Sequence, residues 1–589
     1  MAVDQSPMNK LITEHIDIWT SAVKTRSTSG RGSSKKLELY GVKKLRELIL
    51  ELAVRGKLVP QDPNDEPASV LLECIAEEKD NLIKEKKIRK PIKTEQIGSD
   101  EVPFELPVGW EWRRLVHLVT VLGDGLHGTP EYSENGEYFF VNGNNLSNGS
   151  IQIKPETKRV SEEQYLKHKK DLNDRTVLVS INGTLGNVGF YNNEAVMLGK
   201  SACYFNLFQD ISKDYIKRLI ESPYFRNYAF AVATGSTIKN LGLKAMNNFV
   251  LAVPPKAEQH RIVAKVDELM TLCDQLEQQT EASIEAHQVL VTTLLDTLTN
   301  SADADELMQN WARISEHFDT LFTTEESIDQ LKQTILQLAV MGKLVPQDPS
   351  DEPAAELLKR IAEEKAQLVK EKKIKKQKAL PPISEDEKPF ELPSGWEWCR
   401  GDEIADFIDP QPSHRTPPKV EGGVPYIGYT DIDHNSGINF NNARKVGGNV
   451  LEEHRERYTL RVGDFVFGKI GTLGKPFFLP KPFDYCLSAN LILIQPKNEH
   501  VTPKFLALYL NSPTLYQVLG EQKTNSTHGV FGIKKARLLP IPLPPIQEQD
   551  LIVAKIEELE SICEQLKMRL IDSHTTKVKL TDAIVEQAM

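Results

Sequence analysis

The chain of 589 residues carries one long pattern twice, and no other feature limits its possible folds as strongly. Residues 45–68 read LRELILELAVRGKLVPQDPNDEPA, and residues 331–354 read LKQTILQLAVMGKLVPQDPSDEPA. Further blocks return in the same order: PFELPVGWEW as PFELPSGWEW, and PPKAEQHRIVAKVDEL as PPIQEQDLIVAKIEEL. Between these blocks the copies diverge. The sequence therefore predicts two copies of one unit, in which like helical stretches face two like partners and unlike modules perform two different tasks.

The repeated blocks predict long helices with an apolar stripe. The stripe residues are separated by steps of four and three, and they are Ile262, Val266, Leu269, Cys273 and Leu276 in one copy and Ile552, Ile556, Leu559, Cys563 and Leu566 in the other. A single stripe of this kind fits an ordinary core helix. Because each of two such helices follows a globular module, we expect the two helices to pair as a coiled coil, with Cys273 and Cys563 in its seam.

Shorter helices are expected over 42–55 and 328–341, since Gly56 and Gly342 follow as helix caps. The runs KEKKIRKPIK and KEKKIKKQK are expected on helix ends as solvated charge, with DNA phosphate contact as the alternative. Residues 27–36, STSGRGSSKK, are expected to form a flexible polar linker.

The variable modules, 107–253 and 393–543, differ in sequence pattern from the repeated helical blocks. Short β-branched and aromatic runs such as EYFFV, TVLVSI, CYFNLF, FVFGKI and LILIQP alternate with Gly, Asn and Pro turns. The expected fold class is α/β, in the mixed α+β sense, with each module built around twisted sheets. The modules carry 16 basic against 14 acidic residues and 17 against 15, so each has a net charge of +2 within a chain of −11. Mildly basic modules permit DNA contact without proving it.

Composition excludes several classes of protein. We find no run of roughly 18 apolar residues that could span a membrane, and no export signal at residues 1–15. The six cysteines are widely spaced without a CxxC pair, which indicates buried, reduced thiols and no zinc ribbon. The loop GKIGTLGK at 468–475 resembles a phosphate-binding loop, but its spacing is wrong and Pro476 follows where a hydroxyl is needed. We expect no catalytic, cofactor-binding or metal-binding residues, and a binding protein is favoured over an enzyme.

Sparse matches inside the modules complete the pattern. HGTP at 127–130 corresponds to HRTP at 414–417, and GTLG at 183–186 corresponds to GTLG at 471–474. Together with the closing PPxxEQxxIVAKxxEL helices, these motifs resemble the specificity subunit of Type I restriction-modification systems. The long LAVxGKLVPQDPxDEPA repeat resembles the IB, EcoAI-like branch of that family. Residues 1–40 and about 300–325 are additions to the minimal family pattern.

The resemblance implies a division of the chain into an N-terminal helical repeat region, target recognition domain 1, a central helical region, target recognition domain 2 and a C-terminal coiled-coil helix, with bounds at 1–106, 107–253, 254–392, 393–543 and 544–589. Each recognition domain would read one half of an asymmetric, bipartite site in double-stranded DNA. The long helices would form an antiparallel coiled coil that sets the spacing of the half-sites and gives the chain an internal pseudo-twofold repeat.

The resemblance also implies the partners. Two adenine methyltransferase subunits that use S-adenosylmethionine would dock on the repeated surfaces, and two restriction and translocase subunits that use ATP and Mg would complete a cytoplasmic complex. Catalysis would belong to those partners and not to this chain. The competing hypothesis is a bivalent scaffold that binds two proteins and no DNA.

Candidate DNA contacts are polar residues on module loops, because such side chains read base edges. In module one they are His127, Thr129, Asn142, Asn144, Asn145, Asn182, Thr184, Lys239 and Asn240. In module two they are His414, Arg415, Thr416, Tyr429, Thr430, Asp431, Lys469, Thr472, Thr527, His528 and Lys534. For each of these residues, stabilisation of a turn is an equally good interpretation.

Overall fold

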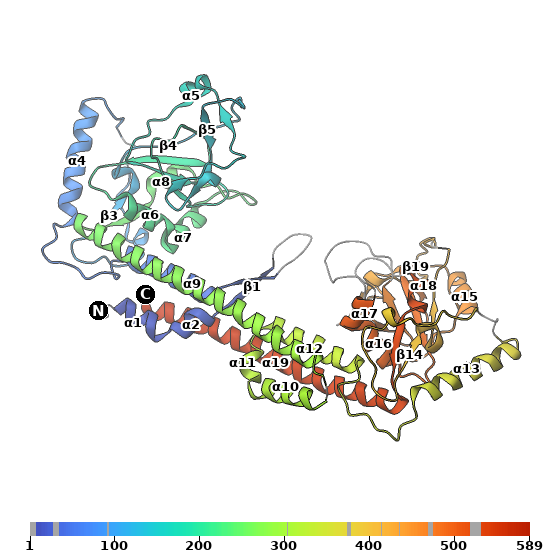
Figure 1. The fold of residues 1–589 in the computed structure, drawn as a ribbon. Coiled ribbons are helices and arrows are strands. Elements are labelled where there is room, and N and C mark those ends of the chain that lie inside the picture. Colours follow the sequence, from blue (N-terminus) through green and yellow to red (C-terminus); the bar gives the residue numbers. More distant parts are fainter. Residues whose placement is uncertain are drawn as a thin grey trace. The chain divides into compact units, whose positions relative to one another are not determined.

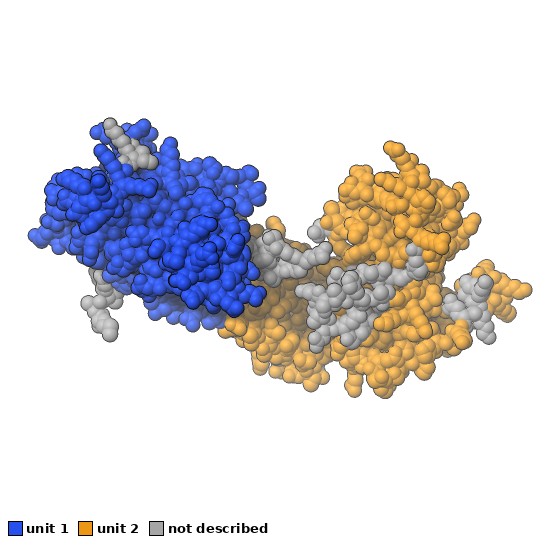
Figure 2. All heavy atoms as spheres, turned by 90° about the horizontal axis from the view of Figure 1, so that it is seen from above, with its two compact units in different colours: residues 1–29, 33–282, 574–589 blue, residues 30–32, 283–573 orange. Residues whose placement is uncertain are grey.

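The computed structural model shows a mixed helix and sheet chain that divides into two compact units (Figures 1 and 2). Unit 1 comprises residues 1–29, 33–282 and 574–589, and unit 2 comprises 30–32 and 283–573. The structure describes residues 7–27, 35–90, 94–302, 304–373, 378–413, 415–434, 436–468, 475–518 and 532–589. The predicted α/β class is confirmed.

Module one in unit 1 is built on a four-stranded antiparallel sheet of order β10-β9-β12-β4 and a three-stranded sheet of order β11-β5-β8. Its strands are β3 (Glu111–Arg114), β4 (Val119–Asp124), β5 (Tyr138–Val141), β6 (Leu146–Ser147), β7 (Ser150–Ile151), β8 (Arg159–Val160), β9 (Thr176–Ser180), β10 (Val188–Phe190), β11 (Val196–Leu198), β12 (Ala202–Leu207) and β13 (Val250–Val253). The short helix η1 (Ser99–Glu101) precedes the module. The helices of the module are η2 (Leu115–His117), η3 (Gly143–Asn145), α5 (Glu162–His168), α6 (Lys213–Glu221), α7 (Pro223–Val232) and α8 (Leu243–Asn248). The strands predicted from EYFFV, TVLVSI and CYFNLF are β5, β9 and β12.

Module two in unit 2 repeats this topology in a diverged sequence. Its sheets have the orders β15-β23-β20-β21 and β19-β16-β22, which match those of module one strand for strand. Its strands are β14 (Glu397–Arg400), β15 (Ala405–Ile408), β16 (Val424–Ile427), β17 (Ile432–Asp433), β18 (Gly437–Ile438), β19 (Arg444–Val446), β20 (Phe465–Gly468), β21 (Phe477–Phe478), β22 (Cys486–Leu487), β23 (Leu491–Pro496) and β24 (Pro540–Leu543). The short helix η4 (Glu385–Glu387) precedes the module. The helices of the module are α14 (Gly401–Ile404), η5 (Tyr429–Asp431), α15 (Gly448–Arg457), α16 (Pro503–Asn511), α17 (Pro513–Val518) and α18 (Ile533–Arg537).

Two long helices, α9 (Lys256–Thr299) and α19 (Ile546–Ala588), each contribute to both units. In unit 2 a third helix, α12 (Glu325–Val340), packs against both of them. Lys332 of α12 forms an ion pair with Glu564 of α19 at 2.6 Å. Val291 of α9, Ile335 of α12 and Ile556 of α19 share one apolar cluster. Gln288 donates to Glu326, and Gln330 donates to Thr292, so α12 runs parallel to α9. Since Lys567 lies near Glu325 and Asp329, α12 runs antiparallel to α19. The predicted antiparallel pairing of α9 and α19 is therefore confirmed, with a third helix added.

Unit 1 repeats this arrangement with α3 (Tyr40–Val54) as the third helix. Arg46 pairs with Asp274 at 2.7 Å and Glu277 at 2.6 Å on α9, while Tyr40 donates to Asp582 on α19 at 2.7 Å. The seam positions Ile262, Val266, Leu269 and Cys273 of α9 are all 0% exposed. The predicted seam positions of both cysteines are confirmed, since Cys563 is also buried. Of the other four thiols, Cys74 is exposed, which corrects the expectation that all six are buried.

The joint between each module and its long helix is a buried carboxylate. Glu258, in the first turn of α9, is 1% exposed and accepts bonds from the Trp110 indole at 2.8 Å and the Gln61 amide at 2.8 Å. Glu548 in α19 repeats the joint with Trp396 at 2.9 Å and Gln347 at 3.1 Å. Burial raises the pKa of both carboxyl groups. The GWEW and PQDP motifs recur because they form this joint.

One of two local expectations needs correction. The charge runs begin at the last residues of α4 (Ala68–Lys84) and α13 (Ala354–Lys370), so their predicted position at helix ends is confirmed. Lys86 and Lys372 adopt φ of 58° where the helices end. The predicted linker 27–36 is shorter than expected, since β1 (Lys24–Ser27) and β2 (Lys35–Glu38) form an antiparallel pair at its ends. The remainder of that linker lies outside the described residues.

The segments at 1–40 and 300–325 are themselves a repeat. Residues 12–19, ITEHIDIW, correspond to 314–321, ISEHFDTL. They form the helix pairs α1 (Pro7–Glu14) with α2 (Ile16–Ser21) and α10 (Ala304–Glu316) with α11 (Phe318–Leu321). The corner residue is His15 with φ −119° and ψ 24°, or His317 with φ −114° and ψ 20°. The duplication therefore includes the segments that the sequence alone left without a role.

Candidate nucleic-acid interface

The predicted loops of module one meet along one edge of its sheets. The turn after β11 is the centre: the Leu126 N–H donates to the Leu198 carbonyl at 2.7 Å, and the Gly143 N–H donates to the Ser201 hydroxyl at 2.9 Å. The same hydroxyl donates to Asn142 at 2.9 Å. Parallel pairing of β11 with β5 brings these loops together although they are far apart in the sequence.

The GTLG turn joins the same edge. The Ile181 N–H donates to the Ser201 carbonyl at 3.0 Å, and the Gly183 N–H donates to the Lys239 carbonyl at 2.9 Å. The Asn182 amide donates to the Asn240 side chain at 3.1 Å. Gly183 has φ 77° and open space where a Cβ would lie, so the turn requires glycine for its backbone and leaves Thr184 exposed. The structure thus brings the predicted loops 127–129, 142–145, 182–184 and 239–240 together.

The candidate residues on this edge differ in their exposure to solvent. His127, Thr129, Asn144, Thr184 and Asn240 are exposed, whereas Lys239 is half-buried. His127 lies 2.6 Å from the Asp124 carboxylate, which orients its imidazole.

Asn145 has a different environment. It is 5% exposed, and its amide donates to Gln152 at 3.0 Å and Thr157 at 3.3 Å. Its side-chain oxygen accepts the Asn142 N–H at 3.0 Å. This side chain stabilises the η3 turn.

Module two has the equivalent turn at η5. Asp431 accepts the Gly428 N–H at 2.8 Å, as Asn145 does in module one. The half-buried Tyr429 hydroxyl accepts the Lys475 N–H at 3.0 Å, and Thr430 is exposed. Arg415 and Thr416 are also exposed. The candidates His414, Lys469, Thr472, Thr527 and His528 lie outside the described residues, as does the second GTLG turn.

The two candidate lysines before the closing strands are not equivalent. Lys239 lies in the loop before α8, whereas Lys534 lies within α18, where it corresponds to Lys244 of α8. A short helix therefore separates the polar segment from the closing strand in each module. Lys534 is exposed, and the neighbouring Arg537 anchors α18 by donating to the Phe407 carbonyl at 2.9 Å.

Lys200 is a functional candidate that sequence reasoning missed. It occupies the central turn between Gly199 and Ser201, its side chain is exposed, and no described carboxylate forms an ion pair with it. Strand pairing makes Ala489 its counterpart in module two, because Gly199 and Ser488 donate equivalent backbone bonds to β5 and β16. A single lysine between two strand-like runs carries no sequence signal; only the non-local pairing of β11 reveals its position.

Two further features of the described residues bear on the kind of site. Within the described ranges, the helices include none with the length and apolar character required to cross a membrane. The same ranges contain one group with metal-ligand geometry, Glu364, Glu499 and His500, in which both carboxylates are exposed. His500 lies 2.8 Å from Glu364, an ion-pair geometry that accounts for that contact.

Known families match this architecture. The Type I restriction modification DNA specificity domain matches twice, over residues 107–286 and 393–573, so both copies of the repeat are covered. The chain belongs to the Type I restriction-modification specificity family. It is 41% identical to the EcoEI and to the EcoAI specificity subunits of Escherichia coli, over 99% of this chain and 100% of each relative. The EcoBI specificity subunit of Escherichia coli is 20% identical over 72% of this chain and 74% of its own length.

Two solved structures are similar to the chain at lower sequence identity. The chain is similar to the HsdS subunit of Thermoanaerobacter tengcongensis at 17% identity, with a TM-score of 0.37, over 83% of this chain and 98% of that one. A chain from a structure on assembly of the type I R-M system is 18% identical with a TM-score of 0.44, over 82% of this chain and 99% of that one. The resemblance to the EcoAI-like branch, expected from the LAVxGKLVPQDP repeat, is confirmed by the full-length relatives.

Proposed function

We propose that this family member is the DNA sequence-specificity subunit of a Type I restriction-modification complex. Each module acts as a target recognition domain for one half of an asymmetric, bipartite site, and the long helices set the spacing. One observation carries the proposal: the two modules share a sheet topology but differ in their loops, while the helices around them contain closely similar sequence blocks. A shared scaffold with different loops suits two different readings of DNA.

The loop edge supplies suitable chemistry. Exposed hydroxyl, amide and imidazole groups can donate to base edges, and lysines can neutralise phosphates. In module one we assign this role to His127, Thr129, Asn144, Thr184, Lys200, Lys239 and Asn240, and in module two to Arg415, Thr416, Thr430 and Lys534. Asn145 and Asp431 act within their turns and set the positions of these neighbours.

The partners follow from the family. We propose that two methyltransferase subunits dock on the repeated surfaces and methylate adenine with S-adenosylmethionine. Two restriction and translocase subunits, with ATP and Mg, complete the complex in the cytoplasm. This chain itself is proposed to be non-catalytic, and the names of its relatives as specificity subunits support that role.

Exchange of module one tests the proposal. Residues 107–253 are replaced by the corresponding module of another family member, the variant is co-expressed with its methyltransferase subunit, and methylated sites are mapped across a genome. One half-site should change while the other half-site and the gap remain. A change in both half-sites would contradict independent reading, and binding without any sequence preference would identify a protein scaffold instead.

A further inference from the structure

The loop after α7 presents an isoleucine beside the GTLG turn of module one. At the base of this loop Thr234 and Asn240 exchange two backbone hydrogen bonds, at 3.0 Å and 2.8 Å, and the Asn240 side chain accepts the Asn182 amide at 3.1 Å. Gly235 has φ 94°, and a Cβ there would lie 2.2 Å from the Ile238 carbonyl oxygen, so the loop requires glycine at this position. The backbone therefore holds residue 238 in a defined place on the edge that carries the candidate DNA contacts.

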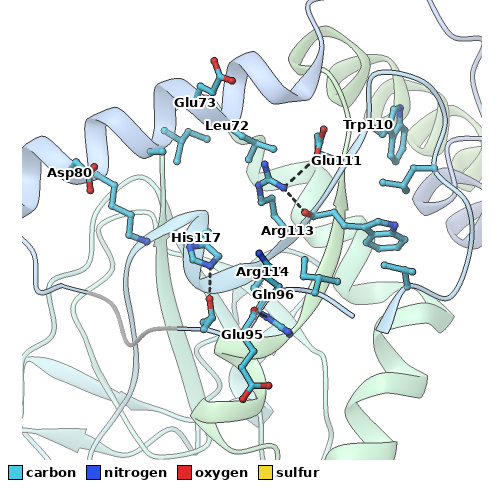
Figure 3. Close-up of a pocket in the computed structure, with 18 of the residues that line it drawn as sticks. Leu72, Glu73, Asp80, Glu95, Gln96, Trp110, Glu111, Arg113, Arg114 and His117 are labelled. Atoms are coloured by element: carbon cyan, nitrogen blue, oxygen red, sulfur yellow. Dashed lines mark hydrogen bonds and ion pairs between the residues drawn. The ribbon is translucent and has the colours of Figure 1, made fainter. Parts of the chain in front are cut away.

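The groove along α4 in unit 1 shows how apolar groups are placed elsewhere in the unit. It has a volume of about 850 Å³, and its lining includes Leu72 and Trp110, which are 6% and 5% exposed (Figure 3). The ammonium of Lys79 in this lining donates to two backbone carbonyls, at 2.5 Å and 3.1 Å, and burial lowers the pKa of Lys79 to about 8. These groups are used inside the unit, whereas Ile238 is 59% exposed.

The position of Ile238 differs in chemistry between the two modules. STIKN at 236–240 corresponds to STHGV at 526–530, so the serine and the threonine are kept while Ile238 corresponds to His528. His528 itself lies outside the described residues. An imidazole can donate and accept hydrogen bonds, whereas an isoleucine can do neither. A position that changes in this way on a shared scaffold can distinguish one half-site from the other.

The edges of the bases offer one methyl group to an apolar side chain. In the major groove thymine presents its C5-methyl, while the other groups that identify a base pair there are hydrogen-bond donors and acceptors. The neighbours of Ile238 on this edge, Asn182 and Asn240, carry amides that suit such polar groups. If the methylated base is adenine, each half-site contains at least one A·T pair and therefore at least one thymine.

We propose that Ile238 is a specificity-determining residue of module one, and that it reads an A·T pair by packing against the thymine C5-methyl in the major groove. This inference rests on the proposed function, because it takes module one as the reader of one half-site. Burial of a single methyl group corresponds to about fourfold tighter binding, which is a measurable effect.

Replacement of thymine by deoxyuridine tests this contact, because the two bases differ only in the methyl group. The half-site of module one is taken from the methylated sites, and each of its thymines is replaced in turn. Binding of the full chain with its methyltransferase subunit is measured by fluorescence anisotropy. For the wild type we expect binding to weaken about fourfold at one of these thymines. Ile238→Ala should weaken binding to the thymine duplex by a similar factor, and it should bind thymine and deoxyuridine equally at that position.

Two further variants make the test specific. Ile238→Val keeps a branched apolar side chain and should keep the preference for thymine. Val108→Ala changes another exposed apolar residue of module one, which is 97% exposed and lies two residues before Trp110 of the joint with α9. This control should change neither the affinity nor the preference for thymine.

Two results would overturn the inference. One is equal binding of thymine and deoxyuridine by the wild type at every position of the half-site. The other is an Ile238→Ala variant that keeps the wild-type preference for thymine; a loss of affinity equal for both bases would then identify a wedge between base steps. If the complex still methylates one bipartite sequence, the proposed function survives either result. A wild-type complex without sequence preference would overturn that function itself, and the inference with it.

Discussion

Replacement of Lys200 by alanine should weaken DNA binding by a predictable amount. Its side chain is exposed and pairs with no described carboxylate, so the variant loses no internal contact and should keep the thermal stability of the wild type. If the ammonium neutralises one phosphate, the slope of log K against log salt becomes less steep by about 0.9. At about 0.1 M salt that slope corresponds to roughly eightfold weaker binding.

Fluorescence anisotropy on a duplex with the methylated site, between about 50 and 300 mM KCl, measures both quantities. Lys200→Arg keeps the charge and should keep the slope. Lys10→Ala removes a lysine that is 71% exposed in α1, and it should change neither affinity nor slope. If Lys200 instead reads a base, the loss should be about 1–3 kcal/mol at one position of one half-site, with the slope nearly unchanged. An alanine variant with wild-type affinity, slope and sequence preference would refute this role of the central turn.

The remaining predictions concern other parts of the molecule. Lys239→Ala and Lys534→Ala should each flatten the salt dependence by about one unit, or relax one position of its own half-site, in the same anisotropy assay. The pKa of Lys79 in the folded chain is about 8, below its ordinary value of 10.5. Between these pH values the unfolded chain binds more protons than the folded chain. The free energy of unfolding of unit 1 should therefore rise by about 3 kcal/mol as pH rises through that window. Lys79→Met should abolish this gain in thermal unfolding, and a pH dependence that persists would exclude Lys79 as its source. Glu258→Ala removes the bonds from the buried Trp110 indole and from the exposed Gln61 amide, and should lower the free energy of unfolding by about 2–4 kcal/mol. The loss should be seen as faster hydrogen exchange in the first turns of α9, while α19 remains protected.

Much of the fold could be predicted because its signals are local. The stripe from Ile262 to Leu276 has helical spacing, and the run TVLVSI becomes β9 because β-branched residues fit a buried strand. The stripe does not say which helices cover it, however. Arg46 meets Asp274 only in the folded chain, so the third helix of each bundle was not predictable.

The candidate site was predictable in part. Glycine and asparagine turns mark the loops, but the loops meet through the pairing of β11 with β5, which no local pattern encodes. Lys200 was missed for this reason, and Asn145 looked like a base reader although its amide is used inside its own turn. The repeat around His15 and His317 was missed because few identical residues mark it. In the structure it is recognised by the matching backbone angles of these two corner residues.

The composition of unit 1 has a consequence for biosynthesis. Residues 574–589 belong to unit 1, and Tyr40 bonds to Asp582 there, yet these residues leave the ribosome after all of unit 2. The helix bundle of unit 1 therefore stays one segment short throughout synthesis of module two. During that interval part of the apolar seam of unit 1 is open to solvent or to a chaperone, and a chain released at residue 573 would have a complete unit 2 and an incomplete unit 1.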